Sequence, residues 1–129
     1  MKGFMMFEYF AVLTSQNELC LQDIKNECIQ ESWVPLCSKV DIQTGESSIL
    51  FFKSLDTARN FIKRNFSRDE LVGVIMIQHD QFDVLKNANV NIQVLEWPQN
   101  FKNSSQYKLA IEVVNLLESP ELNLLYEKI

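Results

Sequence analysis

An uninterrupted run of seven apolar residues in the middle of the chain most limits the folds that are possible. Residues 71–77, LVGVIMI, contain no polar side chain, and a run of this length is typical of a strand that is covered on both faces. Residues 4–13 near the N-terminus are also nearly all apolar and bulky, which predicts a second strand of this kind. The chain therefore needs a sheet with other elements packed on both of its faces.

Two segments have the spacing of amphipathic helices. Apolar residues recur every four positions over 18–32, and those that follow Ser54 lie on one side of a helix that extends to residue 66. Asn17 and Ser54 stand where helix N-caps belong, and Asp80 is expected to cap a short helix. Further strands are predicted over 33–42, 48–52 and 90–98, the first two joined by the turn QTGES.

The C-terminal part of the chain is expected to form two helices, over 105–118 and 120–129. The apolar residues of the first cover well over half of the helix circumference, whereas packing on one face of a sheet needs a stripe only about 100° wide. Ser119 followed by Pro120 is typical of a helix start. The excess apolar surface predicts a second contact, made either with the last helix or with another chain.

The expected order of elements is β-α-β-β-α-β-α-β-α-α, which we interpret as one α+β domain over residues 1–129. The first six elements match a ferredoxin-like arrangement, to which an α-β step and two C-terminal helices are added. No internal repeat, low-complexity tract or Pro/Gly-rich linker indicates a domain boundary. Because a ferredoxin-like order is shared by proteins with many functions, the fold class alone predicts no activity.

Composition disfavours several kinds of partner. The chain carries 17 acidic and 12 basic residues, a net charge of −5, which opposes binding to nucleic acid or to an anionic membrane surface. No apolar run approaches the ~20 residues that span a membrane. Seven and eight residues separate Cys20, Cys28 and Cys37, unlike the close pairs of zinc sites. An odd number of cysteines in a chain of this size predicts reduced, buried thiols in a cytoplasmic protein. We expect no metal and no other cofactor.

His79, Asp80 and Asp83 are the candidate catalytic residues. His79 is the single histidine and follows a buried strand, a place where ligands often bind in sheets with parallel β-α-β connections. An imidazole with two nearby carboxylates could perform acid–base chemistry or hold a metal. The competing interpretation is structural, with Asp80 as a helix cap and Asp83 as a favourable charge in the first turn.

Two kinds of side chain could bind a partner. Arg59 and Lys63 lie one turn apart on the polar face of the second predicted helix and could hold an anion, although a solvated helix face is the common meaning of such a pattern. Trp33 and Trp97 fall at a strand start and a strand end. Aromatic side chains at such positions either anchor a partner or close the end of a core.

Self-association, or binding to a protein partner, is expected through the two C-terminal helices. Large apolar side chains left in water would forgo ~1.5–3 kcal/mol for each that could be fully buried, and pairing of identical surfaces is the commonest way to bury them. The predicted interface residues are Leu109, Val113, Leu116, Leu122, Leu125 and Tyr126.

The favoured hypothesis is a small, acidic, non-catalytic interaction or regulatory protein that acts through a protein partner or as a homodimer. One alternative is a regulatory domain that binds a small ligand. Another is a hydrolase-type enzyme that uses His79, Asp80 and Asp83. A further possibility is that the acidic C-terminal half imitates nucleic acid toward a basic partner.

Overall fold

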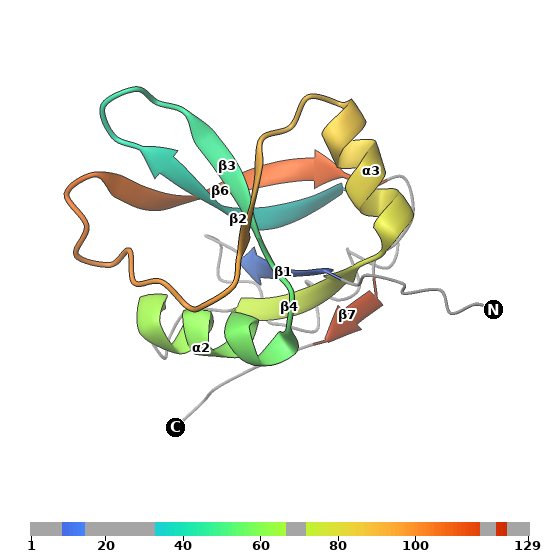
Figure 1. Ribbon diagram of the computed structural model, residues 1–129, viewed down its shortest axis with the longest axis horizontal. Coiled ribbons are helices and arrows are strands. Elements are labelled where there is room, and N and C mark those ends of the chain that lie inside the picture. Colours follow the sequence, from blue (N-terminus) through green and yellow to red (C-terminus); the bar gives the residue numbers. More distant parts are fainter. Residues whose placement is uncertain (1–8, 15–32, 67–71, 117–120, 124–129) are drawn as a thin grey trace.

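The computed structural model describes residues 9–14, 33–66, 72–116 and 121–123. Within these residues the chain has a mixed α+β fold of seven strands and two helices (Figure 1), which confirms the predicted class. The strands are β1 (Tyr9–Thr14), β2 (Trp33–Asp41), β3 (Ser47–Phe52), β4 (Val72–Ile77), β5 (Ile92–Leu95), β6 (Tyr107–Asn115) and β7 (Glu121–Asn123), and the helices are α2 (Leu55–Asn65) and α3 (His79–Asn87).

The two apolar runs found in the sequence form the centre of the sheet. β1 and β4 pair antiparallel from Tyr9↔Ile77 to Thr14↔Val72. On its other edge, β1 pairs with the end of β3 and, through Leu13, with β2. β2 and β3 pair with each other only near their turn, so this hairpin opens around β1. Three strands that are all antiparallel to one another cannot share a flat sheet, and strong twist or bending of the strands is therefore required.

The two helices cover opposite faces of the sheet (Figure 1). Alternate residues of β1 divide between two buried clusters: Ala11 and Leu13 face the side of α3, whereas Val12 faces the side of α2. This is the period of two expected of a strand that is buried on both faces. The remaining strands lie at the margins, with β5 parallel to β3, β6 antiparallel to β2 and β7 antiparallel to β4.

Local sequence signals explain the hairpin turn and the start of α2. Oδ1 of Asp41 accepts hydrogen bonds from the backbone N–H groups of Gln43 (2.9 Å) and Thr44 (3.1 Å), and Gly45 then adopts a φ of +76°, which glycine tolerates without steric cost. Ser54 caps α2 as predicted, because its Oγ accepts a hydrogen bond of 3.1 Å from the backbone N–H of Thr57.

α3 begins two residues earlier than predicted, and Asp80 is not its cap. Gln78 is the N-cap residue, and it forms a capping box with Gln81, whose Oε1 lies 3.0 Å from the backbone N of Gln78. Asp80 therefore lies inside the first turn, where a negative charge is favourable. Gln81 is only 5% exposed, so burial of its side chain favours this cap over one made by an exposed aspartate.

The predicted helix over 105–118 is wrong. Residues 107–115 form β6, which pairs with β2 along its whole length, from Asp41↔Tyr107 to Trp33↔Asn115. Polar or small residues at 108, 110 and 112 alternate with apolar ones, a period of two that a sheet face accommodates. Four apolar residues that widen the predicted helix stripe lie instead on one face of this strand. They are Tyr107, Leu109, Ile111 and Val113.

The predicted helix over 120–129 and the ferredoxin-like order are not confirmed. Residues 121–123 form β7, opposite residues 74–76 of β4, and residues 124–129 lie outside the described part of the chain. β1 and β2 pair directly and antiparallel, whereas a split β-α-β arrangement requires them to be parallel. The predicted helix over 18–32 also lies outside the described residues.

Candidate functional site

The three candidate catalytic residues all lie on the exposed side of α3. Nε2 of His79 and Oδ2 of Asp83 are 3.3 Å apart, with side chains that are 60% and 51% exposed. Such an exposed i,i+4 pair contributes at most about 0.5 kcal/mol to stability, and only while the imidazole is protonated. Asp80 is exposed as well. The helix thus brings His79 and Asp83 together in solvent, outside the pocket described below.

The two candidate anion-binding residues lie on the outer face of α2. Arg59 and Lys63 are exposed, because the opposite face of the helix carries the buried residues Ala58, Phe61 and Ile62. Their predicted placement on one solvent-facing side is confirmed, whereas anion binding by this pair stays a prediction.

The structure describes the side chain of Trp97 but not that of Trp33. Trp97 follows β5 and is 62% exposed, so the interpretation that it closes a core is wrong. An exposed indole remains available as an anchor for a partner. Trp33 is the first residue of β2 and lies opposite Asn115, and its side chain is outside the described part.

The expected interface residues do not form one surface. Leu116 is 1% exposed and belongs to the core on the side of α3, so the prediction that it contacts another chain is wrong. Leu109 packs partly against the core on the side of α2, and Val113 is 57% exposed. These two side chains lie on the same face of β6, since they are four residues apart in one strand.

The rest of the expected interface falls largely outside the described residues. Leu122 lies in β7 opposite Ile75 of β4, and its side chain is not described. Leu125 and Tyr126 lie beyond β7, also outside the described part. An interface built from two C-terminal helices is therefore wrong at residues 107–115 and is untested at residues 124–129.

The margin of β6 that faces away from β2 is the first candidate site. Among the described strands β6 pairs with β2 only, and we call the side of β6 that faces away from β2 the β6 edge. Val113 on this strand is one of the large apolar side chains that are mostly exposed. Near the start of β6, Lys39 Nζ lies 4.4 Å from the ring centre of Tyr107 and donates a hydrogen bond to Gln93 Oε1, which fixes this end of the strand against β2 and β5.

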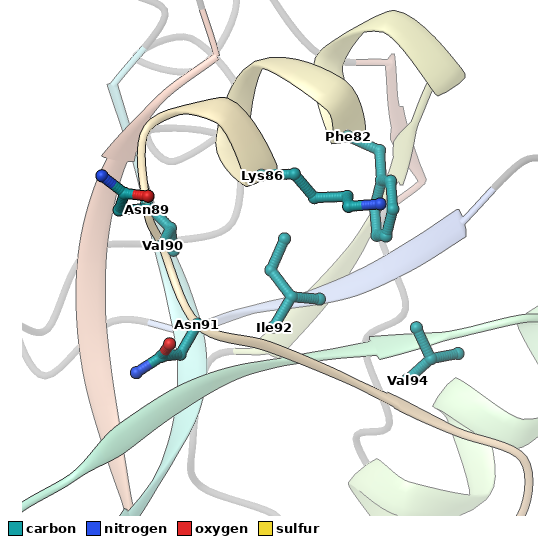
Figure 2. Close-up of a pocket in the computed structure, with 7 residues that line it drawn as sticks. All are labelled: Phe82, Lys86, Asn89, Val90, Asn91, Ile92 and Val94. Atoms are coloured by element: carbon teal, nitrogen blue, oxygen red, sulfur yellow. The ribbon is translucent and has the colours of Figure 1, made fainter.

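A pocket of about 430 Å³ between α3 and β5 is the second candidate site. Figure 2 shows Ile92 and Val94 on β5 below Lys86 and Phe82, which extend from α3. The ammonium group of Lys86 lies 5.7 Å from the ring centre of Phe82, and this ring stacks on Tyr9 at 4.3 Å. Phe82, Ile92 and Val94 supply apolar side chains to the lining. Asn89, Val90 and Asn91 complete the lining at the other end.

The sequence patterns predicted two residues of the β6 edge, Leu109 and Val113, as contacts but placed them in a helix, and they gave no sign of the pocket. The β6 edge had a detectable signal, because the alternation in YKLAIEV has the period of a half-buried strand. The pocket had none, since its residues come from a helix, a connection and an edge strand that only the tertiary structure brings together. Of the three cysteines, Cys37 is confirmed as buried; Cys20 and Cys28 are outside the described residues.

In the described part of the chain, no group of three or more His, Cys, Asp or Glu side chains is arranged to hold a metal ion. No helix in that part is long and apolar enough to cross a membrane. A comparison with protein families, curated protein sequences and solved structures finds no significant match to this chain.

Proposed function

We propose that this chain is a small, non-catalytic interaction or regulatory protein of the cytoplasm that binds a protein partner through the β6 edge. The observation that supports this function is a nine-residue strand whose outer margin has no strand partner in the described residues. Unpaired N–H and C=O groups on such a margin accept an additional strand, and main-chain hydrogen bonds then supply much of the affinity.

The side chains of β6 suit this mode of binding. Long edge strands in natural proteins are usually shortened, covered or interrupted to prevent unwanted pairing. β6 instead exposes Val113 and leaves Leu109 and Ile111 partly accessible on the same face. A partner strand with apolar residues at alternate positions would cover this row, which gives the contact side-chain specificity beyond its backbone hydrogen bonds.

The proposal is tested by affinity capture from the source lysate with the whole chain, followed by mass spectrometry. Val113→Lys adds a charge to the β6 edge at a mostly exposed position, so the fold should be retained while strand addition is weakened. Ile42→Lys is the matched variant, since it makes the same change at another exposed apolar residue. We expect one stoichiometric protein that is lost with Val113→Lys and kept with Ile42→Lys. The reverse pattern, or no dependence on Val113, would contradict the use of this edge.

A regulatory domain that binds a small ligand is the second candidate function, and the pocket beside α3 favours it. Its volume of about 430 Å³ lies in the usual range for small-molecule sites. The side chains of Phe82, Ile92 and Val94 suit a ring, and Lys86 has no carboxylate partner among the described ion pairs. These features select a ligand with an apolar body and one carboxylate.

Benzoate and its neutral analogue benzamide are suitable probes of this pocket. We expect chemical-shift changes at Phe82 and Ile92 with benzoate, weaker ones with benzamide, and loss of the difference in Lys86→Gln. Lys102→Gln, at an exposed lysine outside the pocket, serves as the control. Equal responses to the two probes, or none at millimolar concentration, would remove the support for a carboxylate site.

A further inference from the structure

Two charged residues of β6 lie beside apolar neighbours within their own chain. Lys108 and Glu112 share the face of β6 that looks toward α3, and the register with β2 places them opposite Val40 and Leu36. Neither charged group takes part in the ion pairs of the described residues. A positive and a negative charge thus lie four residues apart on the same face of β6, and neither has an ion-pair partner among the described residues.

We propose that the β6 edge pairs with the β6 edge of a second copy of this chain, antiparallel, with a two-fold axis through Ala110. This inference rests on the proposed function, because it uses the same edge, and it identifies the protein partner as another copy. The two sheets would join into one continuous sheet across the axis, with β6 and its symmetry mate at the centre.

Symmetry allows few registers, and charge selects one of them. In a two-fold antiparallel pair the axis passes between one residue and the same residue of the second copy, and residues at equal distance in sequence on either side face each other. An axis at Ala110 places Lys108 opposite Glu112 of the second copy, and this pair occurs twice. An axis at Ile111 places Lys108 opposite Val114. An axis at Glu112 makes this carboxylate face its own copy, and like charges directly opposite each other are destabilising.

The same axis also matches the apolar row on the other face of β6. It places Leu109 opposite Ile111 and Tyr107 opposite Val113, each pair occurring twice. Aromatic and β-branched side chains in opposite positions stabilise a sheet. The most exposed apolar side chain of β6, Val113 at 57%, is thereby covered. One register thus satisfies both charges and buries the exposed valine.

Charge reversal gives a sharp test by sedimentation velocity of the full chain between roughly 1 and 100 micromolar, which spans moderate dimer affinities. We expect a wild-type dimer. Lys108→Glu and Glu112→Lys each place like charges opposite each other in two positions, and each should raise the dimer dissociation constant by about tenfold or more. The double variant restores both attractive pairs and should return the constant to within about threefold of wild type.

Mixing the two single variants is the decisive experiment. Each variant alone is expected to dimerise at least about tenfold more weakly than wild type. A mixed pair across the Ala110 axis has opposite charges in both positions, so the mixture should form a heterodimer at concentrations where neither variant self-associates. Lys102→Glu makes the same change of charge at an exposed lysine outside β6 and should dimerise like wild type. The difference between variants should shrink in about 1 M salt, where the screening length is ~3 Å.

Several outcomes would overturn the proposal. These are a monomeric wild type at 100 micromolar (a rough upper limit for a physiological homodimer), single variants that dimerise like wild type, or a mixture that does not associate. If the wild type is monomeric, Lys108 would instead be a charged side chain that prevents other strands from pairing with this edge. A monomer that still captures a stoichiometric partner dependent on Val113 would refute self-pairing and leave the proposed function intact. If the wild type neither self-associates nor captures a partner that depends on Val113, the β6 edge is not a binding site.

Discussion

Replacing Asn65 by alanine should lower the free energy of unfolding by about 2 kcal/mol, since this buried amide joins α2 to the connection between β5 and β6. Asn65 is the last residue of α2 and is 7% exposed. Its Nδ2 donates to the carbonyl oxygens of Phe61 (2.9 Å) and Gln99 (2.7 Å), and its Oδ1 accepts from the backbone N–H of Phe101 (2.7 Å). All three hydrogen bonds are lost in Asn65→Ala.

The expected size of the effect follows from where these partners lie. Phe101 is 7% exposed, and leaving its N–H buried without an acceptor costs about 1–3 kcal/mol. Gln99 is only half-buried, so water can replace the lost donor to its carbonyl oxygen at little cost. The higher helix propensity of alanine returns about 0.5 kcal/mol. The net destabilisation is therefore about 2 kcal/mol, most of it from the orphaned N–H of Phe101.

Urea unfolding at neutral pH measures this difference directly. Asn60→Ala on the exposed face of the same helix is the control and should change the free energy of unfolding by less than about 0.5 kcal/mol. Asn65→Asp keeps the acceptor for Phe101 but places a carboxylate against two carbonyl oxygens, so we expect a loss at least as large as that of alanine. The reasoning is refuted if Asn65→Ala matches the control, or if Asn65→Asp is as stable as wild type.

Three other predictions address the turn, the thiols and nucleic acid. Gly45→Ala should cost about 1–2 kcal/mol in urea unfolding, because alanine strains at a φ of +76°, and Gly45→Asn should cost less. Cys37 should not react with a thiol reagent in the native protein, and three equivalents should react after unfolding; fast native labelling of Cys37 would contradict its burial. A generic DNA duplex should not bind at submicromolar concentration at physiological salt, as the net charge of −5 opposes it; tight binding would direct attention to Arg59 and Lys63.

The sequence by itself determined those elements in which the spacing of apolar residues fits either a strand or a helix but not both. The apolar runs around Val12 and Ile75 could only be strands covered on both faces, and they form the centre of the sheet. The spacing after Ser54 agrees with a helix and with no strand, and the cap residue marks its first turn. In each case the information needed was local, because neighbouring residues supplied both the pattern and the stop signal.

The candidate sites depended on distant parts of the chain. The pocket joins α3 to β5, and the amide of Asn65 reaches Gln99 and Phe101 in another connection. No spacing in the sequence predicts such contacts. The β6 edge was partly predictable, since Leu109 and Val113 were expected to contact another chain, although from a helix, and Leu116 was wrongly included.

Only the tertiary structure decided that residues 107–115 form a strand. The apolar residues of this segment fit a broad helix stripe and also fit the alternation of a strand, so periodicity alone did not separate the two. The segment pairs with β2 along its full length, from Asp41↔Tyr107 to Trp33↔Asn115. A helix satisfies its backbone N–H and C=O groups within its own segment, whereas a strand obtains partners for them only from another strand. Whether β6 exists therefore depends on β2 being in place beside it.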